Sequence, residues 1–306
     1  MNYDNIQLKE AIDQYFLACR VNNISGYTMK AYWYHLKNFS KVIGNIPVQS
    51  LSTDHIRRFL ANEMGRKNQH TGEELSSYTI NKSYSVIRSF CNYLVDEGYI
   101  PYAPTDKIKP PKVDKDLPEA LSQDEIIRIF DYLERFCSFR DKLIFEFFLD
   151  TGCRLNEVAN LTIDDVNLDD GMVKVFGKGR KERIVFMGNK LCHDLHRYIM
   201  LHRRAPIDEK GLFVSSVEPY KRLTRDGIST MIKRVHKEVG VKGKYGPHKL
   251  RHTMATQYIK NGGEVGHLRF MLGHTNITTT QRYVNLSPKE VKEAHHKFSP
   301  LDRLDD

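Results

Sequence analysis

The stretch GPHKLRHTMAT, at positions 246–256, carries the strongest local signals in the chain. Pro247 suits the first turn of a helix, because proline has no N–H to leave unbonded and its backbone angle is already helical. His248 and Arg251 follow three positions apart, which places both side chains on one face of that helix. An imidazole beside a guanidinium can hold an anion and transfer a proton near neutral pH. The stretch therefore predicts a helix with an anion-binding face.

Three other segments supply candidates for the same chemistry. Arg154 follows a Thr-Gly break in TGCRLNEVANL and begins a helical stretch, where its guanidinium and backbone N–H groups can face an anion together. Lys178 lies in the turn of VFGKGRKERIVF, whose glycines permit a tight turn. LGHTNITTTQRY places His274 in a helix break and Tyr283 on a short following helix. Taken singly, each residue also fits an ordinary surface charge or packing position.

The sequence predicts two domains joined by a proline-rich linker. Apolar residues recur at three- and four-residue steps through the first hundred positions, which is the pattern of helices with one buried face. Five prolines then fall within positions 101–118, and clustered prolines form an extended connector. We expect a helical domain at 1–106, a linker at 107–118 and a larger domain at 119–306. Helices are expected at about 6–22, from Ser25 or Thr28 to Gly44, after Thr53, and at 77–97.

The sequence pattern predicts that the larger domain is mainly helical with one small antiparallel sheet, an α+β fold. The alternating runs MVKVF (172–176) and RIVFM (183–187) flank a glycine-containing turn and predict a β-hairpin. Ser122 and Glu125 form a capping-box pattern for a helix that reaches about Phe136. Further helices are expected at 139–149, 189–203, 224–239, 247–261, 264–272 and 288–297.

Charge is distributed unevenly along the chain. The net charge is +9, but residues 171–260 hold 21 Lys or Arg against 7 Asp or Glu, whereas residues 111–170 hold 7 against 15. A concentrated positive field favours a polyanionic partner, with binding that weakens steeply as salt increases. A solvated basic face that serves only solubility is the alternative.

Other features of the sequence argue against a membrane-spanning, secreted, disulfide-bonded or zinc-binding protein. No run approaches the eighteen apolar residues of a membrane span, and the first residues lack the layout of a secretory signal, so we expect a cytoplasmic protein. The five cysteines include no CxxC pair, which argues against a disulfide framework and a zinc site. We expect no metal and no cofactor.

As a set, the candidate residues resemble the catalytic pattern of the tyrosine recombinases, the Xer-type and phage-integrase-like site-specific recombinases. The intervals between them are 24, 70, 3, 23 and 9 residues, and the flanking text RDKLIFEFFLDTGCRLNE, GKGRKER, PHKLRHTMAT and LGHTNITTTQRY matches as well. The resemblance covers nearly the whole chain and implies that residues 1–106 are the family's helical, SAM-like core-binding domain. Two small departures are Ala103 before Pro104, where Asn is usual, and Cys153. The matched positions are Arg154, Lys178, His248, Arg251, His274 and Tyr283.

The resemblance also implies a mechanism. Tyr283 would attack the scissile phosphate and form a 3′-phosphotyrosyl link, with His248 as the base and Lys178 as the acid that protonates the departing 5′-oxygen. Arg154 and Arg251 would bind the non-bridging oxygens. The imidazole of His274 would add a hydrogen bond. Glu157 would orient the arginines or the neighbouring lysine, or it would form a structural ion pair.

The partners implied are double-stranded DNA core sites and a homotetramer that joins two such sites. Whether accessory DNA-bending proteins take part is left open, as is the docking of the C-terminal helix on its own or a neighbouring subunit. A type IB topoisomerase and a catalytically silent architectural DNA-binding protein are the alternatives. The sequence does not identify the DNA target or distinguish a phage, transposon or chromosomal role. Candidates for phosphate contact are Arg57, Arg58, Lys82, Arg88, Arg225 and Lys244.

Overall fold

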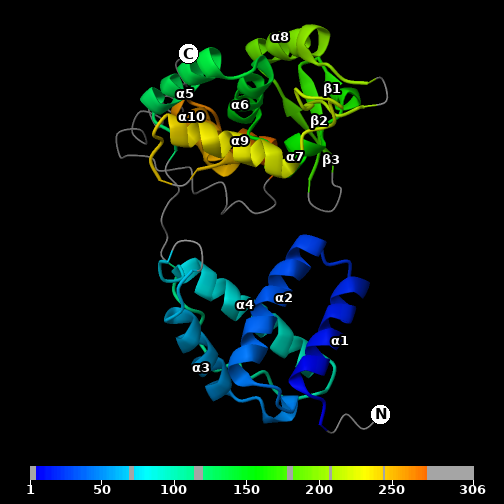
Figure 1. Ribbon diagram of the computed structural model, residues 1–306, viewed down its shortest axis with the longest axis vertical. Helices are drawn as coiled ribbons and strands as arrows, with labels where there is room; N and C mark the ends of the chain where they lie inside the picture. Colours follow the sequence, from blue (N-terminus) through cyan, green and yellow to red (C-terminus); the bar gives the residue numbers. More distant parts are fainter. Residues whose placement is uncertain are drawn as a thin grey trace, which may run out of the picture. The chain divides into compact units, whose positions relative to one another are not determined.

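The computed structural model of the 306-residue chain forms two compact units, Met1–Asp116 and Leu117–Asp306, here called the N-terminal and C-terminal units (Figure 1). Each unit has its own hydrophobic core. The expected fold class is confirmed, since both units are mainly helical and the C-terminal unit holds one small antiparallel sheet. No helix within the described residues is long and apolar enough to cross a membrane. The structure describes residues 5–68, 72–113, 120–177, 182–206, 209–243 and 245–273.

The described part of the N-terminal unit contains four helices, and serine caps set where two of them begin. Ser25 caps the second helix by accepting a hydrogen bond from the Thr28 N–H at 3.2 Å. Ser76 caps the fourth in the same way, with the Thr79 N–H at 3.3 Å. Each cap satisfies a backbone donor that the first helical turn would leave unbonded. The helices are α1 (Leu8–Val21), α2 (Gly26–Ile43), α3 (Thr53–Met64) and α4 (Ser77–Asp96), with a 3₁₀ turn at Val48–Ser50.

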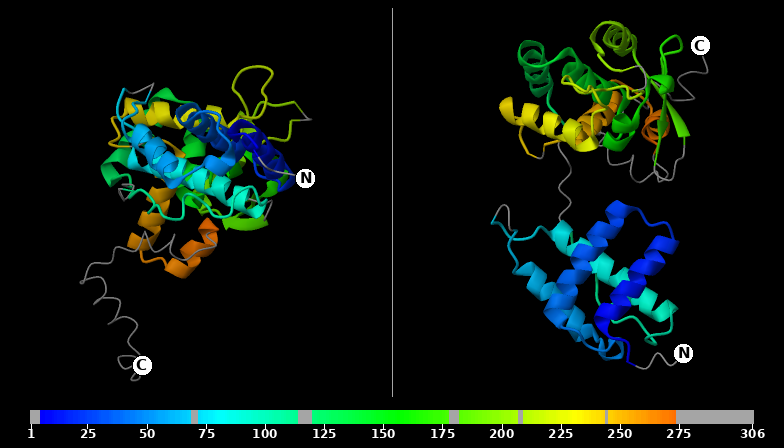
Figure 2. Two further views of the ribbon diagram at one scale, coloured as in Figure 1. Left: turned by 90° about the horizontal axis from the view of Figure 1, so that it is seen from below. Right: turned by 45° about the vertical axis from the view of Figure 1, so that its right-hand side comes forward.

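The core of the N-terminal unit lies between these helices. α2 packs against α1, α3 and α4, and the views in Figures 1 and 2 agree in placing α1 beside α2. Phe39 of α2 meets Phe59 of α3 edge to face, with ring centroids 5.2 Å apart. Beyond α4, the carbonyl of Ile108 accepts a hydrogen bond from the Tyr84 hydroxyl at 3.0 Å. The chain after α4 is therefore attached to this unit at Ile108.

α6 is the central helix of the C-terminal unit. It is contacted by α5, α8 and α10, and its Leu143, Ile144, Phe145, Phe147 and Phe148 are fully buried. The predicted capping box is present at the start of α5. The helices among the described residues of this unit are α5 (Gln123–Phe136), α6 (Phe139–Thr151), α7 (Leu155–Asn160), α8 (Asn189–Arg197), α9 (Arg225–Glu238), α10 (Pro247–Lys260) and α11 (Val265–Leu272).

The sheet has three strands in the order β1-β2-β3, all antiparallel. β2 (Met172–Phe176) and β3 (Glu182–Phe186) form the predicted hairpin, with Val173 opposite Val185 on the buried face. β1 (Val166–Asn167) was not predicted, because two residues carry no alternating pattern.

One predicted helix is interrupted in the structure, and another falls outside the described residues. The helix expected at 189–203 is interrupted, because α8 ends at Arg197 and a π-helical turn, Tyr198–His202, follows it. The helix expected at 288–297 lies outside the described residues.

Candidate active site

Arg154 lies where α6 gives way to α7. Gly152 ends α6 in a left-handed conformation, and Arg154 is the N-cap of α7. Glu157, one turn into α7, accepts a hydrogen bond from the Arg154 backbone N–H at 2.7 Å and from its Nη1 at 3.0 Å. The Arg154 side chain keeps 39% of its surface exposed. Its guanidinium is therefore anchored on one side and open to solvent on the other.

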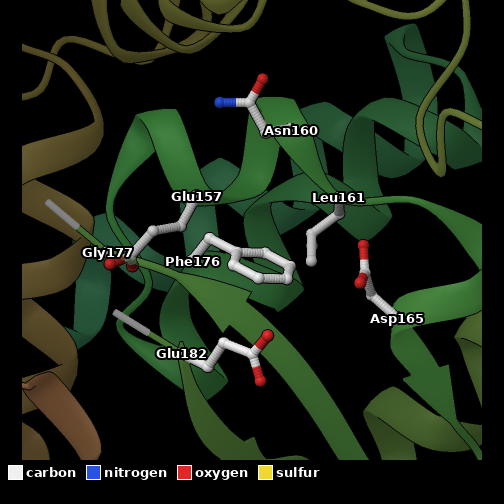
Figure 3. A pocket seen from close by; sticks show the side chains of 7 residues that line it. All are labelled: Glu157, Asn160, Leu161, Asp165, Phe176, Gly177 and Glu182. Atoms are coloured by element: carbon white, nitrogen blue, oxygen red, sulfur yellow. The ribbon is translucent and has the colours of Figure 1, made fainter. Parts of the chain in front are cut away.

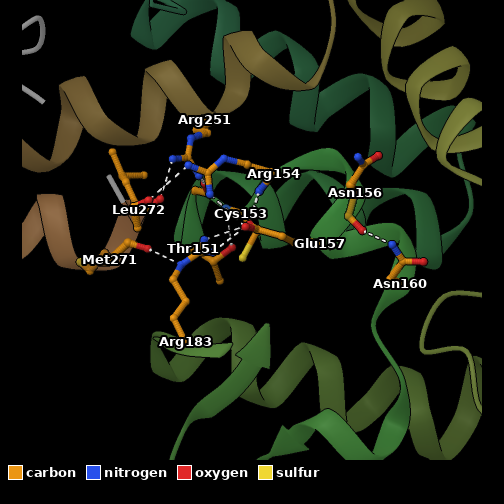
Figure 4. A network of polar contacts seen from close by, with 12 residues as sticks. Thr151, Cys153, Arg154, Asn156, Glu157, Asn160, Arg183, Arg251, Met271 and Leu272 are labelled. Carbon is orange, nitrogen blue, oxygen red and sulfur yellow. Dashed lines mark hydrogen bonds and ion pairs between the residues drawn. The ribbon is translucent and has the colours of Figure 1, made fainter. Parts of the chain in front are cut away.

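Arg251 is buried and reaches the same place from α10. Its Nη1 donates to the Gly152 carbonyl at 2.5 Å, and its Nη2 donates to the Leu272 carbonyl at 2.8 Å. Arg154 makes a longer contact, 3.4 Å, with the next carbonyl along the chain, that of Gly273. Figure 4 shows the contact between Arg251 and Leu272 at the end of α11. Two guanidinium groups from positions 97 residues apart in the sequence thus share one small region.

His248 lies one turn before Arg251 on α10, as the spacing predicts. Burial lowers the pKa of His248, and the positive charges of Arg251 and Arg154 lower it further, although part of the residue stays exposed. Arg225, at the first position of α9, adds a third positive charge that acts in the same direction. The imidazole is therefore held neutral at physiological pH and can accept a proton.

A buried histidine supports the start of α10. The Nδ1 of His236, on α9, accepts a hydrogen bond from the Gly246 N–H at 3.3 Å, immediately before Pro247. His236 is fully buried, and this burial lowers its pKa to about 4. The neutral ring therefore fixes the backbone that leads into His248.

Arg183, on β3, is part of the site and was not selected from the sequence. It binds Glu157 through two N–H groups, with Nη1–Oε1 at 2.5 Å and Nη2–Oε2 at 2.9 Å. Its Nε also donates to the Met271 carbonyl at 3.2 Å. The sequence offered no signal for this residue, because a strand arginine next to a lysine-rich turn is ordinarily a solvated charge.

The structure brings together three of the six matched residues, Arg154, His248 and Arg251. The other three, Lys178, His274 and Tyr283, lie outside the described residues, so their positions stay predictions.

The candidates for phosphate contact are spread over several elements. Arg57 and Arg58 are exposed on α3, and Arg58 lies 3.6 Å from the exposed carboxylate of Asp54. Lys82 and Arg88 are exposed on α4. Arg225 is exposed at the first position of α9, and Lys244 lies outside the described residues.

A cavity of about 680 Å³ lies beside the β2–β3 hairpin (Figure 3). Among the described residues, its lining includes the carboxylates of Glu157, Asp165 and Glu182 and the ring of Phe176. In the part of the chain that the structure describes, the guanidinium groups of Arg154 and Arg251 are the ones placed to bind an anion together.

Arg154, Arg251 and the neutral His248 together form an arrangement that can bind a phosphate group and accept a proton. The phage integrase family matches residues 119–290, and the N-terminal SAM-like domain of phage integrases matches residues 12–98. The chain belongs to the phage integrase family, whose members are tyrosine recombinases. It is an enzyme that cleaves and rejoins DNA strands in site-specific recombination, and enzymes of this family need no metal.

Individual relatives agree with this membership. The chain is 33% identical to tyrosine recombinase XerD of Oceanobacillus iheyensis, in a match that covers 96% of this chain and 99% of that protein. The crystal structure of XerA recombinase is 26% identical, with a TM-score of 0.51 and coverage of 95% and 99%. A lambda integrase tetramer bound to a Holliday junction shares the fold, with 17% identity, a TM-score of 0.73 and coverage of 90% and 80%.

Proposed function

We propose that Tyr283 is the nucleophile of this recombinase. Its phenolic oxygen attacks the scissile phosphate and forms a 3′-phosphotyrosyl bond, while the bond from phosphorus to the 5′-oxygen breaks and leaves a 5′-hydroxyl. Attack by a 5′-hydroxyl on the phosphotyrosine reverses these steps and joins the strands. The phosphotyrosyl bond conserves the energy of the broken phosphodiester, so no external energy source is required.

The convergence of Arg154 and Arg251 is the observation that most strongly supports a phosphoryl-transfer reaction at this site. Negative charge grows on the non-bridging oxygens as phosphorus becomes pentacoordinate, and fixed guanidinium groups stabilise that charge. Arg251 is held rigidly by two carbonyls, and Arg154 is held by Glu157 with its outer side open. Positioned cations of this kind perform the part that metal ions have in other phosphoryl-transfer enzymes.

His248 is the proposed general base. A phenol has an unperturbed pKa of about 10 and needs a proton acceptor to attack at neutral pH. The lowered pKa of His248 keeps its ring neutral and able to take that proton. We assign Lys178 as the acid that protonates the 5′-oxygen, and His274 as a further hydrogen-bond donor to the phosphate. Proton transfer of this kind typically contributes about 10²- to 10⁴-fold to the rate.

We further propose that the substrate is a pair of double-stranded core sites held by a homotetramer. The tetramer of lambda integrase on a Holliday junction supports this assembly by similarity of fold. Residues 1–106 would act as the core-binding domain, 107–118 as the linker and 119–306 as the catalytic domain. The exposed arginines and lysines of α3, α4 and α9 would contact DNA phosphates. The cytoplasmic location stays a prediction.

A duplex that is nicked close to the cleavage position tests the chemistry. Cleavage releases a short fragment that diffuses away, so the protein stays covalently attached and is seen as a shifted band on a denaturing gel. We expect wild-type protein to form this adduct in buffer that contains a metal chelator. Tyr283→Phe should bind the duplex and form no adduct. Tyr102→Phe, at an exposed position in the N-terminal unit, should react like wild type.

The possible outcomes separate the alternatives. An adduct together with exchange between two differently labelled sites supports the recombinase assignment. Relaxation of supercoiled DNA without any joint product would indicate topoisomerase activity. DNA binding with no adduct from wild-type protein would overturn the proposed chemistry and indicate an architectural role.

A further inference from the structure

Arg183 connects three parts of the site that are distant in the sequence. It lies on β3, and its side chain is only 13% exposed. Two of its N–H groups bind both carboxylate oxygens of Glu157, which is 2% exposed. A bidentate pair of this kind fixes the relative orientation of the two side chains more tightly than a single contact does. The pair therefore ties the β2–β3 hairpin to α7.

Glu157 also holds Arg154, so two arginines share one buried carboxylate. Burial alone would raise the pKa of Glu157, but hydrogen bonds from the Arg183 side chain and the Arg154 backbone hold it below its usual value. The carboxylate is therefore charged. Without Arg183, a buried negative charge would lose half of its partners, and the Arg154 guanidinium would be the nearest group able to replace them.

Arg183 also supports the end of α11. Its Nε donates to the Met271 carbonyl at 3.2 Å. Its side chain lies against Gly273 so closely that a Cβ added to this glycine would be 3.0 Å from the Arg183 Cδ. The carbonyls of Leu272 and Gly273 accept hydrogen bonds from Arg251 and Arg154 respectively. Arg183 thus contacts Glu157, which holds Arg154, and the residues on both sides of Leu272, whose carbonyl holds Arg251.

We propose that Arg183 is a positioning residue for the two arginines that bind the scissile phosphate, acting through Glu157 and through the last turn of α11. This role rests on the proposed function. Arg183 itself makes no contact with the reacting atoms in this proposal. Its loss turns Arg154 toward Glu157 and loosens the Leu272 carbonyl that helps to hold Arg251, so the phosphate loses part of its positive environment during the reaction.

The test measures single-turnover adduct formation on the nicked duplex at saturating protein, using two substrates. One carries the natural phosphate at the cleavage position, and the other carries a methylphosphonate, which lacks one non-bridging negative charge and so depends less on a cationic clamp. Misplacement of a catalytic group by about 1 Å can cost on the order of 10²-fold in rate. We expect Arg183→Gln to react about 10- to 100-fold more slowly on the phosphate, with DNA affinity close to wild type.

The methylphosphonate distinguishes positioning from general destabilisation. The deficits of Arg183→Gln and Arg154→Gln, each relative to wild type on the same substrate, should both shrink on the methylphosphonate. Arg140→Gln is the matched control, because Arg140 is 16% exposed, pairs with the buried Asp141 and donates to the Val214 carbonyl at 2.8 Å, away from the clamp. This control should lose thermal stability and keep the wild-type rate on both substrates.

A second, more conservative variant keeps the proposal testable if Arg183→Gln does not fold. Arg183→Lys keeps the charge but cannot bind both carboxylate oxygens in the same fork geometry, so we expect a folded protein with an intermediate rate. The proposal is overturned if folded Arg183 variants cleave the phosphate at the wild-type rate. It is also overturned if their deficit is the same on both substrates while that of Arg154→Gln shrinks. Failure of wild-type protein to form any adduct would instead overturn the proposed function, and the positioning role with it.

Discussion

Replacing Gly152 with alanine should destabilise the C-terminal unit for two separate reasons. Gly152 has a φ of +61°, a conformation that costs a residue with a Cβ about 1–2 kcal/mol. An added Cβ would also lie 2.9 Å from Leu272 Cδ2 and 3.1 Å from Met254 Sδ, both on buried residues. Overpacking of a close-packed site typically costs about 1–3 kcal/mol. We expect Gly152→Ala to lower the free energy of unfolding by about 2–5 kcal/mol in total.

Gly240 provides a matched control in the same unit. Its φ is +66°, and an added Cβ would meet no atom within 4 Å. Gly240→Ala should therefore lose only the conformational part, about 1–2 kcal/mol. The difference between the two variants isolates the cost of crowding Leu272 and Met254.

Thermal unfolding of the full chain is a suitable assay. For a unit of 150–250 residues, 1 kcal/mol corresponds to about 2–4 °C in Tm, so we expect losses of about 4–20 °C for Gly152→Ala and about 2–8 °C for Gly240→Ala. Displacement of Leu272 should also move the carbonyl that Arg251 binds. Only Gly152→Ala should therefore slow adduct formation on the nicked duplex. Equal Tm losses and equal rates for the two variants would refute the packing argument.

Three further predictions follow from individual contacts. Arg225 helps to lower the pKa of His248, so Arg225→Gln should raise that pKa. The acidic limb of the pH profile of the cleavage rate, measured at saturating DNA, should then move to higher pH, and an unchanged limb would contradict this prediction. His236 has a folded-state pKa of about 4 against about 6.5 when unfolded, so its contribution to stability is fully present above pH 6.5 and is lost as pH falls toward 4. His236→Leu should leave the Gly246 N–H unpaired and lower the free energy of unfolding by about 1–3 kcal/mol at pH 8. As pH falls, this variant should lose less further stability than wild type does, and urea midpoints that fall as steeply as in wild type would count against this. Ser122→Ala should lower the urea midpoint of the C-terminal unit by the equivalent of about 1 kcal/mol, and no change would show that the capping box is dispensable.

The elements that were predicted correctly depend on short-range signals. Ser25 and Ser122 begin their helices because a hydroxyl two or three residues before an N–H can satisfy that donor in any tertiary context. The alternating runs of the hairpin form strands whose buried positions are Val173, Val175 and Val185. Where local pattern is absent or misleading, prediction failed, as it did for the two-residue strand β1 and for the π-helical turn after α8.

The residues of the candidate site also differ in whether a local sequence signal predicts them. The shared helical face of His248 and Arg251 follows from three-residue spacing, and the structure has it. That Arg154 joins them was implied by family resemblance, since no local rule connects residues 97 positions apart. Arg183 was missed altogether, because its partners Glu157 and Met271 lie 26 and 88 positions away.

The sequence by itself determined the helices, the hairpin, the concentration of positive charge and the residues able to handle a phosphate, because each depends on near neighbours or on composition. Only the tertiary structure decided that α10 lies along α6, and with it that Arg251 reaches the Gly152 carbonyl beside Arg154. Contacts between distant segments require the loss of chain entropy, and burial of apolar surface must outweigh that loss. The residues that meet at the site are therefore selected by the packing of the whole unit, which the local sequence does not encode.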